Sequence, residues 1–153
     1  MPKKKPLQDN TTAFFTFFNE VGIIAQLSRA VLEAHLPDGV SASQFSILNH
    51  LIRVSDGRTP LELAKAFQVP KTTMTSTLSG LEQRGLIEMQ LNPLDHRSKQ
   101  VWLTNSGQQF RERAIKLLGH DADRFATKVD VNKIAKLTLL LTQVRTVLDA
   151  DRD

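Results

Sequence analysis

Two short helices joined by a tight turn, with a β-hairpin directly after them, form the feature that most limits what this chain can fold into. The first helix is predicted over residues 60–67, because Thr59 is a good N-cap and Glu62 stands at capping-box spacing from it. The second helix is predicted over residues 70–84, and Gly85 is expected to end it. Two short helices cannot bury their apolar faces alone, so they must pack against each other and against a further element.

The hairpin is predicted from two partly alternating segments, residues 86–91 and 99–103, with the polar and turn-rich residues 92–98 between them as its tip. Two short helices followed by such a hairpin indicate a winged helix-turn-helix. In that fold the second helix needs an apolar back and a polar front. Apolar residues at steps of four and three supply the back: Met74, Leu78 and Leu81.

Longer helices are predicted on both sides of this segment. Apolar residues at steps of three and four predict a helix over residues 11–36, and a shorter helix over 43–54 follows it. Thr104 is expected to cap a helix over 105–127, and a last helix extends from Asp130 to about residue 149. The predicted fold class is therefore mainly α, with six helices and a wing of two to three strands.

The first and last helices carry more apolar surface than a small core can cover. The last helix follows a three-four heptad rhythm, which favours packing against another helix. A second copy of the chain is the expected partner, and burial within a single chain is the alternative. The side chains expected in a dimer interface are Phe14, Phe17, Phe18, Leu137, Leu141, Val144 and Leu148.

Composition and charge restrict the functions that remain. The formal net charge is +4, which suits a polyanionic partner without proving one. The chain has no cysteine, so disulfides, thiolate zinc sites and thiol redox sensing are excluded. No apolar stretch approaches the length of a membrane span, and we expect no contact with a membrane. These features together favour a cytoplasmic protein.

The polar front of the second short helix and the hairpin tip are the candidate functional surface. Hydroxyl side chains and a lysine on that front can meet base edges and phosphates in the major groove, although a solvated helix face is the alternative. In the tip, Arg97 can reach the minor groove if Asp95 orients its guanidinium group, and an ordinary turn salt bridge is the alternative. The residues expected to contact double-stranded DNA are Lys71, Thr72, Thr75, Ser76 and Ser79 of the helix, and Asp95, His96, Arg97 and Lys99 of the tip.

These residues resemble the MarR family of bacterial regulators. The resemblance covers residues 59–64 and 81–87, continues through Asp95-His-Arg97 to residues 101–104, and ends at Gly107. It implies an obligate homodimer that binds a pseudo-palindromic operator. It also implies a repressor that a small, often aromatic or phenolic, effector releases from DNA.

The lysines and interrupting polar residues near the start predict that residues 1–10 form a basic flexible tail. The resemblance further implies that residues 11–36 and 105–150 form a helical dimerisation domain and that residues 41–104 form the winged-helix DNA-binding domain. An effector pocket is expected between the first, second and fifth helices, but its lining residues are not readable from the sequence. No other cofactor and no metal site are expected, because the histidines are scattered.

Two other classes of protein remain as alternatives. An enzyme would need a nucleophile elbow, a phosphate-binding glycine loop or a metal-ligand spacing, and the sequence contains none, so we expect no enzymatic activity. A protein-interaction module with weakened or lost DNA binding is the other alternative. The sequence departs from the family pattern at Gln68, Pro70, Ser76 and Gly80, and the departures at Ser76 and Gly80 keep this alternative open.

Overall fold

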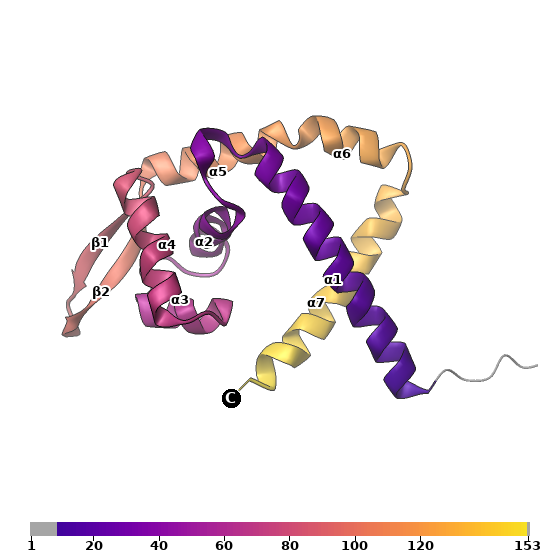
Figure 1. Cartoon of the computed structure of the whole chain (residues 1–153), viewed down its shortest axis with the longest axis horizontal. Helices are drawn as coiled ribbons and strands as arrows, with labels where there is room; N and C mark the ends of the chain where they lie inside the picture. The colour runs from indigo at the N-terminus through magenta and orange to yellow at the C-terminus, as the bar shows by residue number, and fades with distance from the viewer. Residues whose placement is uncertain (1–8, 153) are drawn as a thin grey trace, which may run out of the picture. The chain divides into compact units, whose positions relative to one another are not determined.

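The computed structural model describes residues 9–152, which form two compact units, one ending at Ala114 and the other beginning at Ile115 (Figure 1). The first unit contains α1 (Asn10–His35), a 3-10 turn η1 (Pro37–Gly39), α2 (Ala42–Arg53), α3 (Pro60–Phe67), α4 (Lys71–Gln83), β1 (Ile87–Asn92) and β2 (Asp95–Leu103). Helix α5 (Asn105–Leu117) leads into the second unit, which continues with α6 (Gly119–Ala126) and α7 (Val131–Ala150). Of the predicted tail, residues 1–8 lie outside the described residues, whereas Asp9 and Asn10 belong to the start of α1.

The predicted helix starts are confirmed by side-chain caps. Thr59 and Glu62 form a reciprocal capping box at the start of α3, in which the Thr59 amide donates to Glu62 Oε2 at 2.8 Å. This bond is the main reason why the pKa of the Glu62 carboxyl is lowered. Asp130 accepts from the amide of Asn132 at 2.8 Å and caps α7. These starts were readable because a cap is a local interaction between residues two or three apart.

The core of the first unit lies between α2, α3, α4 and the base of the hairpin. The predicted apolar back of α4 is confirmed, since Met74, Leu78 and Leu81 are at most 2% exposed. They belong to one buried cluster with residues of the neighbouring elements, including Leu48, Leu51, Leu63, Ile87, Val101 and Phe110. Burial of α4 along this one side determines which of its side chains remain in solvent.

The hairpin differs from its prediction at the tip. Strands β1 and β2 pair antiparallel, with Met89 opposite Val101, and Arg58 adds a single bridge to Val101 in place of a full third strand. Strand β2 begins at Asp95, so the predicted tip over residues 92–98 was too long. The polar residues at the start of β2 extend the strand into solvent, where side chains need not alternate between apolar and polar. A prediction from apolar periodicity therefore did not include them.

The predicted helix over residues 105–127 is divided. The amide of Leu118 donates to the carbonyl of Ile115, three residues earlier, at 3.1 Å, whereas an α-helix would use the carbonyl four residues earlier. Helix α6 then starts at Gly119. Glycine is a poor helix former, which favours a break here. The apolar periodicity continues across the break, so the sequence pattern did not reveal it.

The ends of α4 and β2 and the start of α5 meet at Thr104. Its hydroxyl donates to the carbonyl of Gly85 at 2.7 Å and accepts from the amide of Gly107 at 3.0 Å, and its own amide donates to the Leu86 carbonyl at 3.2 Å. A Cβ atom at position 107 would overlap the Leu86 carbonyl oxygen. We call these four residues the Thr104 junction. It requires glycine at position 107, and this explains the glycine in the family pattern.

The Gly107→Ala substitution should destabilise the fold by about 1–3 kcal/mol, because the added methyl group has no room against the backbone at Leu86. Gly119→Ala is the matched control. Its Cβ would meet no atom within 4 Å, so stability should stay unchanged or rise by up to about 1 kcal/mol. Urea unfolding followed by circular dichroism measures both changes. Equal midpoints for the two variants would contradict the junction as described.

Candidate nucleic-acid interface

Helix α4 turns the five predicted side chains away from the core. Lys71, Thr72, Thr75 and Ser76 are exposed, and Ser79 is half-buried. The Thr75 hydroxyl donates to the Lys71 carbonyl at 2.9 Å, so it presents only acceptor lone pairs to solvent. Among the described residues, the hydroxyls of Thr72 and Ser76 make no hydrogen bond and remain free both to donate and to accept.

The start of α4 has no side-chain cap. Its N-cap residue is Pro70, whose side chain offers no acceptor, whereas α1, α2, α3 and α7 are each capped by a side chain. The amides of the first turn, together with the helix dipole, therefore give a partial positive charge that attracts anions such as phosphate. The exposed Lys71 adds a full charge at the same place.

Two departures from the family pattern have structural explanations. Gln68, in the turn before α4, has φ 52° and ψ 44°, a left-handed conformation that glycine adopts without strain. A Cβ on Gly80 would approach Nε2 of Gln44 to 2.5 Å, and Gln44 belongs to the capping box of α2. Sequence analysis identified Gly80 only as a departure from the family pattern. The structure shows that this glycine lets α4 pack closely against the start of α2.

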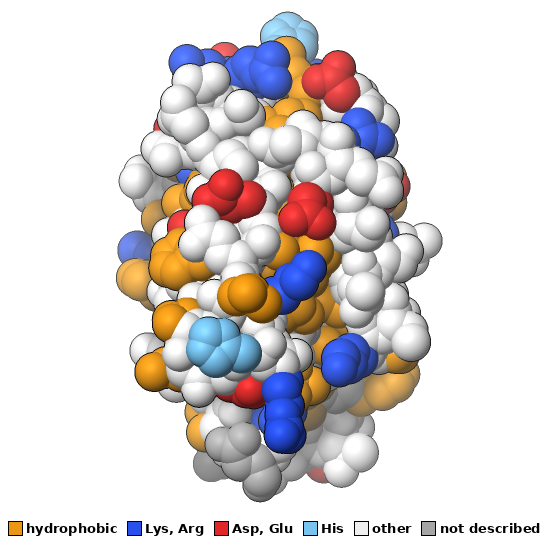
Figure 2. Space-filling view, turned by 90° about the vertical axis from the view of Figure 1, so that its left-hand side faces the viewer, with side chains coloured by type: hydrophobic (Ala, Val, Ile, Leu, Met, Phe, Trp, Pro, Cys, Tyr) orange, Lys and Arg blue, Asp and Glu red, His pale blue; other side chains and the backbone are white. Residues whose placement is uncertain are grey.

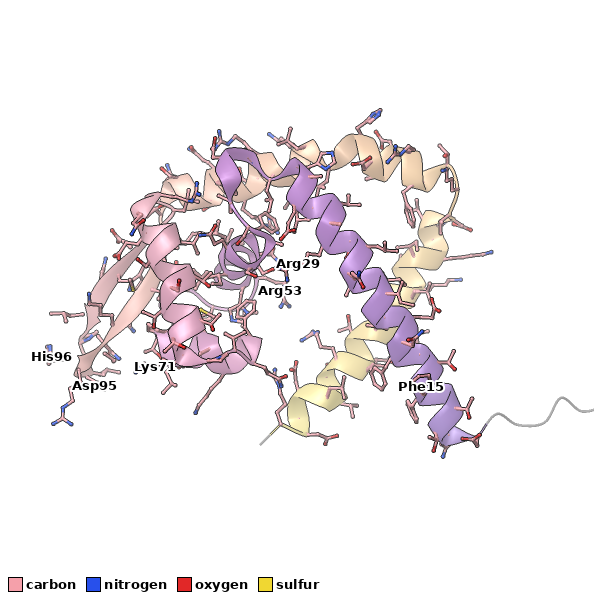
Figure 3. All side chains as sticks on the ribbon, in the orientation of Figure 1. Phe15, Arg29, Arg53, Lys71, Asp95 and His96 are labelled. Atoms are coloured by element: carbon pink, nitrogen blue, oxygen red, sulfur yellow. The ribbon has the colours of Figure 1, made fainter. Side chains whose placement is uncertain are left out.

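The hairpin carries the other predicted side chains into solvent. Asp95, His96, Arg97 and Lys99 are all exposed. Figure 3 shows Asp95 and His96 at the end of the hairpin, pointing away from the helices, and Lys71 at the start of α4. Helix α4 packs against β1, so the two elements are held together within the first unit.

The hairpin tip is held by hydrogen bonds between side chains and backbone. Asp95 Oδ1 accepts from the Arg97 amide at 3.0 Å, and Ser98 Oγ donates to the Asp95 carbonyl at 3.1 Å. Asn92 joins the network, because its Nδ2 donates to Ser98 Oγ and its Oδ1 accepts from the Leu94 amide, both at 3.0 Å. Sequence reasoning missed Asn92 and Ser98, although an Asn-Pro turn is a known signal for such bonds.

The predicted contact between the Asp95 carboxylate and the Arg97 guanidinium is wrong. Among the described residues, no ion pair joins them, and the carboxylate holds the Arg97 backbone. A two-residue separation within one strand lets a carboxylate reach an amide more readily than the end of a long side chain. The guanidinium group of Arg97 is therefore left free in solvent.

In the lobe formed by residues 55–104, most carboxylates accept hydrogen bonds from backbone amides. Residues 55–104 contain six Lys and Arg residues and five Asp and Glu residues, and Figure 2 shows both signs interspersed on one face of the molecule. Asp56 accepts from the Leu103 amide and Glu82 from the Met89 amide, at 3.0 and 3.2 Å. Within the described part of the chain, Lys71, Arg97 and Lys99 have no carboxylate within ion-pair distance. The positive charges of these three exposed side chains are therefore unpaired.

The ring of His50 is partly buried and packs against an aromatic side chain. Its ring centroid lies 5.3 Å from that of Phe67, between α2 and α3. Burial lowers the pKa of His50, and the nearby charges of Arg53 and Arg58 lower it further. Over residues 9–152, no group of three or more His, Asp or Glu residues could hold a metal ion.

The predicted interface side chains of α1 and α7 lie on apolar faces that their own unit leaves uncovered. Phe14 is 60% and Phe18 42% exposed on α1, while Leu137 is 52%, Leu141 43% and Leu148 49% exposed on α7. Phe17 and Val144 are half-buried. Neither helix contains a buried residue. No helix of the described chain is both long and apolar enough to cross a bilayer.

Comparisons with known proteins agree on one family. Residues 38–98 match the MarR family. The multiple antibiotic resistance protein MarR of Escherichia coli K12 is 32% identical over 126 residues, which cover 81% of this chain and 87% of that protein. The transcriptional repressor YetL of Bacillus subtilis 168 is 37% identical over 78 residues, 50% of this chain and 47% of its own length. A crystal structure of a mutant E. coli MarR with operator DNA has a TM-score of 0.69 at 28% identity, covering 90% of this chain and 99% of the other.

Two substitutions of Asp95 test whether its hydrogen bond to the Arg97 amide or its negative charge orders the hairpin tip. Asp95→Asn retains an oxygen that can accept from the Arg97 amide, so the tip should stay ordered, whereas Asp95→Ala should loosen it. Backbone ¹⁵N relaxation of residues 94–98, each of which has an amide N–H, measures this order. An asparagine variant as mobile as the alanine variant would show that the carboxylate charge, and not the hydrogen bond, orders the tip.

Proposed function

This chain belongs to the MarR family, and from that premise we propose that it is a transcriptional regulator that binds a pseudo-palindromic DNA operator as a homodimer. The observation that carries the proposal is the pairing of an uncapped, polar recognition helix with a hydrogen-bonded wing tip whose cations have no carboxylate partner. DNA supplies the regularly spaced phosphates and base edges that such a surface can bind.

Helix α4 enters the major groove in this proposal. Its first turn and Lys71 face a phosphate, and Thr72, Thr75, Ser76 and Ser79 meet base edges or further phosphates. The wing, formed by β1 and β2, follows the duplex so that Arg97 reaches the minor groove, where the potential is negative. His96 and Lys99 contact the backbone beside it, and Asp95 acts by holding the tip.

A second copy of the chain covers the apolar faces of α1 and α7. Complete burial of a leucine or phenylalanine side chain contributes roughly 1.5–3 kcal/mol, and these side chains are about half exposed, so covering each contributes roughly half of that before entropic costs. Several such side chains on each helix therefore favour a permanent interface. We propose residues 11–36 and 105–150 as the dimerisation domain and residues 41–104 as the DNA-binding domain.

We further propose that the protein acts as a repressor in the cytoplasm and has no enzymatic activity. A B. subtilis relative described as a transcriptional repressor supports the direction of regulation. A small aromatic or phenolic effector, rather than a cofactor, is expected to release the protein from DNA.

Arg97→Ala should weaken binding to an operator fragment by at least roughly tenfold, since a charge-assisted contact contributes about 1.5–3 kcal/mol. The thermal midpoint should not change, because the exposed guanidinium group makes no contact that stabilises the fold. Fluorescence anisotropy with a DNA fragment selected by the wild-type protein measures the affinity. Arg124→Ala, on α6, is the control. Affinity within about twofold of wild type in both variants would reject Arg97 as a groove contact.

Pro70→Asp should separate stability from DNA binding. Aspartate can cap α4, which should raise stability by about 0.5–1 kcal/mol, but its carboxylate occupies the free amides and repels phosphate. Operator affinity should fall several-fold relative to the Pro70→Ala control. If both variants bind the operator equally well, the start of α4 does not face a phosphate.

Leu141→Asp should dissociate or unfold the homodimer, because the substitution places a charge in the apolar face of α7. Leu94→Asp is a matched control, since Leu94 is 94% exposed at the hairpin tip. Sedimentation equilibrium gives the mass of each variant. A folded dimer of the Leu141 variant would remove this residue from the interface.

A further inference from the structure

Leu94 is the most exposed of the large apolar side chains in the described part of the chain, at 94%. It lies in the turn of the hairpin, between the end of β1 and the start of β2, and Figure 3 shows the neighbouring Asp95 and His96 at that end, pointing away from the helices. Isolated exposed apolar side chains are common on protein surfaces, so exposure alone assigns no role to Leu94. Its backbone support, the charges beside it and its place on the hairpin do.

The turn holds the backbone of Leu94 in place. The Leu94 amide donates to Asn92 Oδ1, and Asn92 Nδ2 donates to Ser98 Oγ on the other strand, both at 3.0 Å. Pro93 lies between them, and its ring fixes one backbone dihedral angle. A side chain on a backbone that is already ordered loses less entropy when a partner covers it.

Exposed cations follow this leucine along β2. Among the described residues, Arg97 and Lys99 have no carboxylate within ion-pair distance, and the Asp95 carboxylate accepts from the Arg97 amide. An apolar protein surface that covered Leu94 would leave these cations without partners. A groove of double-stranded DNA supplies both kinds of partner, because phosphates meet the cations while sugar walls and base edges meet the leucine.

The inference rests on the proposed function, which places Arg97 in the minor groove. Leu94 precedes Arg97 by three residues, so the two Cα atoms lie at most roughly 10 Å apart. Base pairs follow one another at about 3.4 Å along the duplex. The leucine side chain therefore reaches the same groove within about three base pairs of the arginine.

Base pairs differ in one polar group at the floor of that groove. A·T and G·C pairs both present acceptors there, and only G·C adds a donor, the N2 amino group of guanine. The acceptors are covered in both cases, so their cost cancels in the comparison. A leucine offers no acceptor, and an amino group beneath it would lose its water without a replacement.

We propose that Leu94 is a specificity-determining residue, which rejects guanine and so selects an A·T pair beneath the hairpin tip. Arg97 responds to the potential and the width of the groove, whereas Leu94 responds to one chemical group. Two copies of the chain impose this selection symmetrically, once beside each half-site.

Base analogues separate the amino group from the rest of the base pair. On the DNA fragment that the wild-type protein selects, each A·T pair in the protected minor-groove segments is replaced in turn by G·C, by inosine·C and by diaminopurine·T. Inosine·C lacks the amino group but keeps the major-groove edge of G·C, and diaminopurine·T adds the group to A·T. At one position beside each half-site, fragments with the amino group should bind at least roughly fivefold more weakly in fluorescence anisotropy, and inosine·C should bind as A·T does.

A variant pair tests the assignment to Leu94, because a response of Arg97 to groove width would give the same pattern. Leu94→Asn has nearly the same size and an amide oxygen that accepts from the guanine amino group, so discrimination should fall to within about twofold. Leu91→Asn makes the same change on β1, where Leu91 is 63% exposed outside the turn, and should discriminate as the wild type does.

Discrimination that persists in Leu94→Asn, or that falls equally in Leu91→Asn, would overturn the proposal. So would a wild-type protein that tolerates the amino group at every protected position. A change in the mass of the homodimer in the Leu94 variant would place this side chain in a protein interface and would overturn the proposal as well. A protein that selects no DNA refutes the proposed function together with this inference, whereas one that binds a fragment without discrimination refutes only the inference.

Discussion

One hydroxyl group connects the two elements that we propose bind DNA, helix α4 and the β-hairpin. Thr104 bonds the carbonyl that follows α4 and the amide of the first turn of α5, and its own backbone closes the base of the hairpin. Gly107 allows this crossing because a side chain there would overlap the chain at Leu86. Helix α4 and the hairpin therefore end at the same small junction, which Thr104 holds together.

The charge of the lobe depends on how its carboxylates are used. Asp56, Glu62, Glu82 and Asp95 accept from backbone amides and so help to hold turns, caps and the wing. The cations that would meet DNA keep no such partners in the described chain. A lobe with nearly equal numbers of positive and negative side chains can thus present a positive surface, because its carboxylates are held in hydrogen bonds to the backbone.

The parts that sequence analysis predicted correctly depend on local or periodic signals. The capping box of Thr59 and Glu62 correctly predicted the start of α3. The spacing of Met74, Leu78 and Leu81 correctly predicted which side of α4 is buried and which stays in solvent. The break at Leu118 and the early start of β2 were missed, since apolar periodicity continues across the first and is absent from the second. The role of Asp95 could not be read either, because spacing does not distinguish a bond to a backbone amide from a bond to a guanidinium group.

The central claim is that two such lobes, held by a shared dimer interface, bind one duplex. Hydroxyl-radical footprinting of the wild-type protein on the DNA fragment that it selects tests this claim most directly. Two dimer-related lobes should protect minor-groove positions in two halves related by two-fold symmetry, with half-sites about one helical turn, roughly 34–36 Å, apart. Protection of a single half, or no protection at the minor groove beside each half-site, would contradict it.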